Sequence, residues 1–172
     1  ALGFKRRGTW WKVENLDQPS GLFDEPWETK LPELRDFLFQ TQLPAWHPPK
    51  KTGFFRHIIV RKSFQQDQLL VNLVTSSEGL EHFDSEAFRN KVLALHGERI
   101  AGIQHTINDD VADRSKMENG STQLLFGKNY VEEALLGLNF QMRMESFFQT
   151  NPKCAERLYD KAIQYLLEDL ED

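Results

Sequence analysis

The sequence predicts an α+β domain with a mostly antiparallel sheet and two or three packed helices. Two runs rich in branched and aromatic apolar residues, 54–61 and 68–75, are separated by a short polar stretch, which is typical of an antiparallel hairpin. Apolar residues recur at helical spacing in three other segments, 28–42, 85–96 and 151–170. With 172 residues, the chain is long enough for one domain with its own core.

The first elements are predicted to be a short hairpin and a helix. Residues 2–5 and 9–13 are β-prone and are joined by a turn that contains Gly8. Residues 28–42 follow as a helix, with Pro32 in its first turn. One stripe of this helix is apolar and consists of Leu31, Leu34 and Leu38.

The later elements mix helix and strand. Residues 85–96 form a helix that Asp84 caps and Gly97 ends. A polar loop covers 108–120. Asn151 caps a last amphipathic helix that extends to about residue 170. Further strands are expected at 99–107, 122–126 and 138–144.

Composition indicates an ordinary globular protein. The chain is 40% hydrophobic and 27% charged, and no apolar run approaches the roughly 20 residues that a membrane span needs. We therefore expect no membrane partner. The single cysteine excludes a disulfide within the chain and argues against a cysteine-ligated metal site built from this chain. A reducing, cytoplasmic location fits, with an organelle as the other option.

The charge is unevenly distributed. Residues 1–62 hold 11 Lys and Arg against 7 Asp and Glu, although the whole chain has a net charge of −5. This basic third has two interpretations: a stripe that faces nucleic-acid phosphates, or a solvated surface. Its clusters include Arg6, Arg7, Lys12, Arg56 and Arg61.

Generic catalytic patterns are absent from the sequence. There is no glycine-rich phosphate loop, no nucleophile elbow and no histidine pair at helical spacing. The five histidines are scattered, so a structural or surface role is expected for each. Asp109 and Asp110, with Asp113, form either a divalent-cation site or a loop that caps itself.

A colinear series of motifs resembles the RNA uracil-5-methyltransferases. The series covers almost the whole chain. It consists of Thr52-Gly53-Phe54-Phe55-Arg56-His57-Ile58-Ile59-Val60-Arg61, Leu70-Val71-Asn72-Leu73-Val74-Thr75, Ile103-Gln104-His105-Thr106-Ile107-Asn108-Asp109, Leu125-Phe126-Gly127-Lys128-Asn129-Tyr130-Val131-Glu132-Glu133, Leu136-Gly137-Leu138-Asn139-Phe140, Ser146-Phe147-Phe148-Gln149-Thr150-Asn151 and Ala155-Glu156-Arg157-Leu158-Tyr159.

The resemblance implies a central, RNA-facing domain over 1–145, and the truncated start of a methyltransferase domain over 146–172. The C-terminal helix would lead toward a Rossmann-like domain that the chain lacks. In the family, the glutamine of the Phe-Phe-Gln-Thr-Asn stretch contacts S-adenosylmethionine, and here that residue is Gln149. Phe147 and Phe148 would line the pocket that receives the flipped base, with ordinary core packing as the alternative.

The resemblance also implies what this chain does not carry. The family adds a cysteine thiolate to uracil C6 and removes the C5 proton with a carboxylate, and neither residue falls within the matched part. Many members bind an iron–sulfur cluster, one ligand of which lies shortly after the first hairpin. Here that region reads Leu16-Asp17-Gln18-Pro19. We therefore expect no catalytic residue, no iron–sulfur cluster and no other metal in this chain.

Three hypotheses for function follow. The first is a fragment of an S-adenosylmethionine-dependent enzyme that methylates uracil C5 in tRNA or rRNA, acting as a monomer. The second is a stand-alone or degenerate RNA-binding module without catalysis. The third is a protein-interaction domain, suggested by the acidic C-terminal half of the chain.

Overall fold

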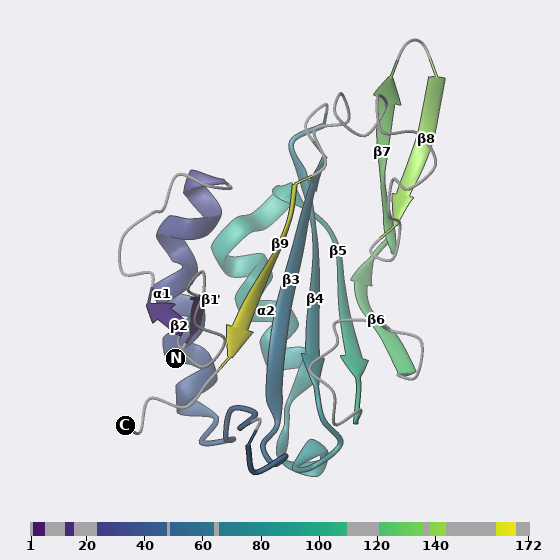
Figure 1. Ribbon diagram of the computed structural model, residues 1–172. Helices are drawn as coiled ribbons and strands as arrows, with labels where there is room; N and C mark the ends of the chain where they lie inside the picture. Colours follow the sequence, from purple (N-terminus) through teal and green to yellow (C-terminus); the bar gives the residue numbers. More distant parts are fainter. Residues whose placement is uncertain are drawn as a thin grey trace.

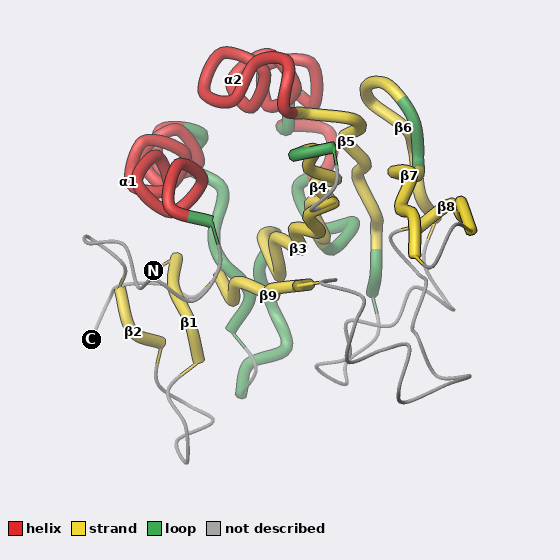
Figure 2. The backbone as a smooth tube through the Cα atoms, turned by 90° about the horizontal axis from the view of Figure 1, so that it is seen from above, coloured by secondary structure: helices red, strands yellow, loops and turns green. Residues whose placement is uncertain are grey.

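The computed structural model describes residues 2–5, 13–15, 24–47, 49–63, 66–109, 121–135, 138–143 and 161–167. Seven strands form one sheet in the order β2-β1-β9-β3-β4-β5-β6, and β7 and β8 form a separate two-stranded sheet. Helices α1 and α2 lie on one side of the large sheet, and the β7–β8 hairpin lies on the other (Figures 1 and 2). The predicted α+β class is confirmed.

The hairpin of β3 (Phe55–Ser63) and β4 (Gln68–Thr75) is the centre of the sheet. The two strands pair antiparallel, as predicted. Strand β5 (Ile100–Ile107) pairs parallel to β4. A parallel neighbour requires a crossover connection, and α2 (Ser85–His96) supplies it.

Helix α2 has the predicted bounds because its end signals are local. The side chain of Asp84 accepts a hydrogen bond from the backbone of Ala87 at 3.1 Å, which satisfies one of the first free N–H groups. Gly97 is the C-cap residue, and its φ is +58°, a value that glycine adopts readily.

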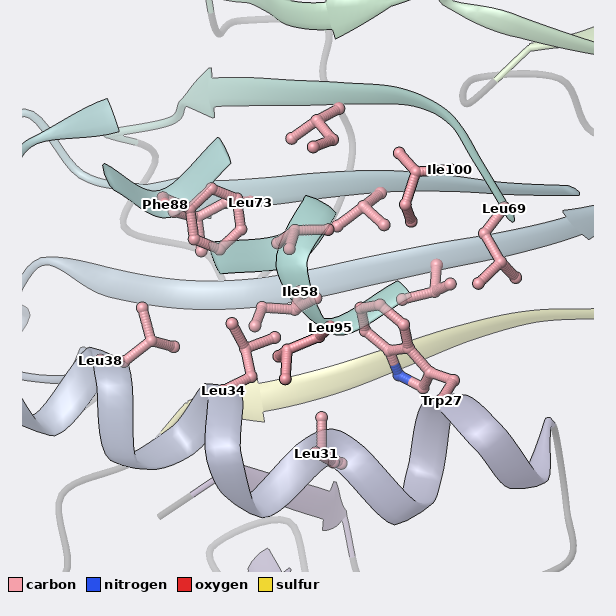
Figure 3. Packing of buried hydrophobic residues seen from close by; sticks show 14 of the residues in the cluster. Trp27, Leu31, Leu34, Leu38, Ile58, Leu69, Leu73, Phe88, Leu95 and Ile100 are labelled. Carbon is pink, nitrogen blue, oxygen red and sulfur yellow. The ribbon is translucent and has the colours of Figure 1, made fainter. Parts of the chain in front are cut away.

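Helix α1 (Glu25–Gln40) begins three residues earlier than predicted. Asp24 caps it, and a proline occupies its first turn, but this proline is Pro26 and not Pro32. Pro32 lies inside the helix, where it removes one backbone hydrogen bond. Burial of the apolar stripe against the sheet offsets that cost; the stripe consists of Trp27, Leu31, Leu34 and Leu38 (Figure 3).

The described strands outside the centre correct one expectation. The first hairpin pairs β1 (Leu2–Lys5) with β2 (Val13–Asn15); residues 9–12 of its predicted second strand lie outside the described residues. Strand β6 (Ser121–Gly127) is followed at once by β7 (Tyr130–Leu135), which pairs with β8 (Leu138–Arg143). The sequence prediction contained no strand at the position of β7.

The predicted C-terminal helix over 151–170 is wrong where the structure describes it. Residues 161–167 form β9 (Lys161–Leu167), which pairs antiparallel with both β3 and β1; residues 151–160 and 168–170 lie outside the described residues. The segment was predicted as a helix from its local apolar spacing. Pairing with β3 satisfies the backbone groups along an edge that would otherwise be open, and this tertiary contact overrides local preference.

Candidate functional site

Most of the residues that the sequence singled out lie outside the described part of the chain. These are Gln149, Phe147, Phe148, Arg6, Arg7 and Lys12. Their assigned roles in cofactor and RNA binding stay predictions. The structure does place Arg56 and Arg61, both on β3.

Arg56 is held by contacts inside the protein. Its side chain is buried, with 2% of its surface exposed. The guanidinium lies 4.2 Å from the centroid of the Trp46 ring, a cation–π arrangement. Its Nη1 donates a hydrogen bond to the carbonyl oxygen of Asn108 at 2.9 Å. In this conformation Arg56 offers almost no surface to a phosphate, and it fixes the chain that leaves β5.

Arg61 belongs to the sheet face opposite the helices. It is 3% exposed and pairs with Leu70 of β4. Leu70 packs with Val131 of β7, so the hairpin β7–β8 covers this end of the face. The structure therefore does not bring Arg56 and Arg61 together on an exposed basic stripe.

Three buried polar side chains continue this face across β4 and β5. Asn72 pairs in register with Gln104, and both are buried. The hydroxyl of Thr106 lies 3.1 Å from Oδ1 of Asn72 and 2.9 Å from the hydroxyl of Thr122 on β6. Among the described residues, the buried Oε1 of Gln104 has no hydrogen-bond partner. The helix-free face is thus polar at its centre, in contrast to the apolar face beneath the helices.

Two of the buried histidines, His96 and His105, are neutral parts of the scaffold. Burial lowers the pKa of His105 to about 4, and its Nε2 lies 2.8 Å from the hydroxyl of Thr75. Burial, with the positive charges of Lys30 and Arg99, lowers the pKa of His96 to about 4. Both rings are uncharged at pH 7, which agrees with a structural role.

An ion cluster joins α1 to the β3–β4 hairpin and to the start of β5. Arg99 donates two hydrogen bonds to Asp24, at 2.9 and 2.8 Å, and Lys62 donates a third at 2.7 Å. Burial by itself raises the pKa of Asp24, but the hydrogen bonds from Arg99 and Lys62 hold that pKa well below its usual range. Asp67 also accepts from Arg99. Every charge in this cluster has an opposite partner, so the cluster is structural.

One exposed feature was missed by the sequence interpretation. Leu124 and Phe126 on β6 are 48% and 38% exposed, although both are large apolar residues. Lys128 follows in the turn to β7, and its Nζ lies 5.5 Å from the centroid of the Tyr130 ring. The sequence places these residues close together but does not give their faces, because a register shift sets Leu124 opposite Gln104 and Phe126 opposite Ile103. The sequence prediction described this stretch only as strand and turn.

The described residues contain neither a metal-binding cluster nor a membrane-spanning helix. They hold no group of three or more His, Cys, Asp or Glu side chains that is suited to a metal ion. Asp109 belongs to no such group among the described residues. Its carboxylate accepts a hydrogen bond from the backbone N–H of Ser77 at 2.7 Å. Within the same part of the chain, no helix combines the length and the apolar character that crossing a membrane requires.

Comparison with known proteins finds RNA methyltransferases among the relatives of this chain. An uncharacterized RNA methyltransferase of Caldanaerobacter subterraneus subsp. tengcongensis is 32% identical over 167 residues, which is 96% of this chain and 36% of that protein. A tRNA (uracil(54)-C(5))-methyltransferase of Pyrococcus abyssi is 25% identical over 95% of this chain and 36% of its own length. Nearly the whole chain is thus similar to one part of RNA methyltransferases. No family model matches it.

The fold agrees with that similarity. The crystal structure of the Pyrococcus abyssi tRNA (uracil-54, C5)-methyltransferase in complex with S-adenosyl-L-homocysteine matches with a TM-score of 0.59 and 23% identity, over 91% of this chain and 35% of that one. At 23% identity the match supports a shared fold and nothing more. The chain spans about a third of the length of the curated relatives that it matches.

Proposed function

We propose that the chain is part of an RNA uracil-5-methyltransferase that transfers a methyl group from S-adenosylmethionine to uracil C5 in tRNA or rRNA. The observation that carries the proposal is the extent of the likeness: 96% of the chain aligns with an RNA methyltransferase at 32% identity. The chain covers 36% of that relative, so the complete reaction belongs to a longer protein.

The described residues supply a scaffold for this function. Helices α1 and α2 pack against one face of the sheet through the buried apolar cluster, and the hairpin β7–β8 lies on the other side. Side chains of that hairpin, such as Glu132 and Arg143, are exposed. The helix-free side is therefore the one that we assign to RNA.

The cofactor contact is a separate element of the proposal. S-adenosylmethionine supplies the methyl group, and the resemblance assigns Gln149 to its binding. This residue lies outside the described residues. The proposed role of Gln149 is to hold a polar group of the ligand through a side-chain amide that both donates and accepts.

Tritium release tests the reaction. The longer protein that contains this chain is incubated with S-adenosylmethionine and with transcripts of tRNA and rRNA that carry tritium at uracil C5. Methylation at C5 expels the tritium, so release that depends on the cofactor is expected for one class of RNA. If neither RNA class releases tritium or gains a methyl group, the proposal fails.

The contribution of Gln149 is tested in the same longer protein. Gln149→Ala should weaken cofactor binding by about 1–3 kcal/mol, because a desolvated partner loses its hydrogen bonds. Gln123→Ala, at an exposed position of β6, is the matched control and should leave cofactor binding unchanged. Equal cofactor affinity for wild type and Gln149→Ala in calorimetry would remove Gln149 from the proposal.

A further inference from the structure

The loop between α1 and β3 folds into a turn with two paired arms. The backbone N–H of Trp46 donates to the carbonyl oxygen of Phe55 at 2.7 Å, and nearer the tip that of His47 donates to the carbonyl oxygen of Thr52, also at 2.7 Å. The loop extends from the sheet on the side away from α2 (Figure 2). His47 and residues 49–52 make up the basic turn.

The base of the basic turn is held firmly by the sheet. A Cβ on Gly53 would lie 2.2 Å from the carbonyl oxygen of Ala45, so the two arms approach to a distance that only glycine permits. The carbonyl oxygen of Gly53 also accepts a hydrogen bond from the hydroxyl of Ser76. Trp46 is buried, and the guanidinium of Arg56 lies 4.2 Å from the centroid of its ring. These contacts fix the direction in which the tip projects.

Two lysines occupy the tip, and both are exposed. Lys50 and Lys51 are adjacent in the sequence, and in the described part of the chain neither side chain forms an ion pair or a hydrogen bond. The carboxylate of Glu78 contacts this segment, but it accepts from the backbone N–H of Gly53 at 3.5 Å and therefore lies at the base of the turn. The tip thus presents two positive charges together.

The backbone of Lys51 has a conformation that suits glycine better than lysine. Its φ is +52°, in the left-handed region that is costly for a residue with a Cβ. Among the described residues, Gln42 and Asp67 also have a positive φ. Gln42 follows the end of α1, where this conformation is common, and the side chain of Asp67 accepts from Arg99. Lys51 has neither reason, and backbone strain of this kind is concentrated at functional sites.

We propose that the basic turn binds the phosphates of RNA through Lys50 and Lys51. The proposal rests on the proposed function, which makes RNA the substrate, and adds where the described part of the chain holds the RNA backbone. An ammonium group is a compact point charge that contacts phosphate oxygens without selecting a base. The turn therefore contributes affinity and orientation, and the choice of the uridine is made by other residues.

The side chains at the tip favour RNA over an acidic protein as the occupant. Lysine is depleted in protein interfaces, whose central part is apolar, whereas the tip exposes Pro49, Thr52 and the two lysines. The exposed large hydrophobic residues of the described part lie on α1 and β6; they are Phe39, Leu124 and Phe126. A phosphate backbone requires only positive charge, because its binding releases counterions.

Fluorescence anisotropy with a labelled single-stranded oligouridine of about 12 nucleotides tests the proposal. The 172-residue chain is titrated at salt concentrations from about 50 to 200 mM. Each phosphate contact on a single strand adds about 0.7 to the steepness with which log K falls against log salt, so two contacts should raise Kd at least about sevenfold across this range. Lys50→Ala and Lys51→Gly should each reduce the steepness by about 0.7 and raise Kd about 1.5- to 5-fold, the contribution of an exposed ion pair.

Lys51→Gly separates RNA binding from folding. Glycine relieves the left-handed strain, so the urea midpoint of this variant should equal or exceed that of wild type while its affinity for RNA falls. Lys51→Arg keeps the charge and should keep the salt dependence. Lys91→Ala removes the same charge from α2, on the other side of the sheet, and should leave the salt dependence unchanged. Glu78→Gln removes a negative charge at the base of the turn and should lower Kd.

The outcomes distinguish the basic turn from the proposed function. If Lys50→Ala and Lys51→Gly bind the oligouridine as wild type does, or if wild type does not bind it at about 50 mM salt, the turn is refuted as an RNA contact, while tritium release by the longer protein would still support methylation. Conversely, the expected losses in these variants without any methylation would leave the turn standing and refute the proposed function. An equal loss in Lys91→Ala, or binding of poly-glutamate but not of the oligouridine, would also refute the turn as an RNA contact.

Discussion

Removing the carboxylate of Asp24 should destabilise the protein more than any change of an exposed acidic residue. The side chain caps α1 by accepting from the backbone of Trp27 at 3.0 Å. It also accepts from Lys62 and from both terminal nitrogens of Arg99. One small group therefore joins a helix, a hairpin and the beginning of β5, elements that are far apart in the sequence.

The magnitude follows from these contacts. Loss of a helix cap costs about 1 kcal/mol, and breaking a buried ion pair by removing one partner costs about 3–5 kcal/mol. The side chains of Lys62 and Arg99 keep 18% and 22% of their surface exposed, and both retain Asp67 as a partner, so the second cost is reduced. We expect Asp24→Ala to lower the free energy of unfolding by about 2–4 kcal/mol.

Asp24→Asn separates the cap from the charge. The amide oxygen still accepts from the helix backbone, so this variant should be about 1 kcal/mol more stable than Asp24→Ala. Because the pKa of Asp24 is lower in the folded state, its stabilisation is complete above the unfolded pKa of about 4 and is lost as the pH falls further. The difference between wild type and Asp24→Asn should therefore shrink below pH 4.

Urea denaturation followed by circular dichroism measures these free energies. Asp36→Ala is the control, because Asp36 is 65% exposed and its ion pair with Arg35 spans 3.5 Å; surface pairs contribute about 0–1 kcal/mol. An Asp24→Ala variant within about 0.5 kcal/mol of wild type would show that the cluster contributes no more than a surface pair. A pH-independent difference between wild type and Asp24→Asn would contradict the charge argument.

Three further predictions concern the sheet and its two sides. Gly102→Ala should lower the free energy of unfolding by about 1–3 kcal/mol, because the added Cβ would lie 1.7 Å from the carbonyl oxygen of Lys128. Urea denaturation measures this loss. An unchanged denaturation midpoint would show that the turn at Lys128 moves aside without cost. Phe88→Ala, at a fully buried position, should cost about 3–5 kcal/mol, and Phe39→Ala, which is 46% exposed, serves as its control; similar losses would contradict the described core. Folding lowers the pKa of His105 to about 4, so this side chain is protonated at a higher pH in the unfolded chain than in the folded one. The free energy of unfolding should therefore fall as the pH drops from 6.5 to 4. His105→Gln should reduce that slope by up to about 1.4 kcal/mol per pH unit, and wild-type denaturation midpoints that do not change between these pH values would refute the assignment.

The sequence predicted the elements whose signals are local. Helix α2 has its cap at Asp84 and its stop at Gly97, within a few residues of the backbone groups that they satisfy. Strands β3 and β4 are apolar enough to be recognised without their neighbours. The start of α1 was missed because Pro32 was taken as the helix-starting proline, although Pro26 fills that place.

The candidate site was harder to predict, because the exposure of its residues depends on tertiary packing. Basic residues on β3 were taken for a surface stripe, yet Arg56 and Arg61 are buried. Whether an arginine is exposed depends on what packs over it, here Trp46 for Arg56 and the neighbourhood of the hairpin β7–β8 for Arg61. Conversely, Phe126 was read as an ordinary strand residue and is exposed.

The sequence by itself determined the α+β class, the central hairpin, helix α2 and the resemblance to RNA methyltransferases. Only the tertiary structure decided that residues 161–167 pair as a strand between β1 and β3. The same holds for the hydrogen bonds that Asp24 accepts from Lys62 and Arg99. Caps and apolar periodicity act over one or two turns of chain, so they can be read locally. Strand partners and burial depend on segments that can lie more than a hundred residues away, and the free energy of those contacts outweighs local preference.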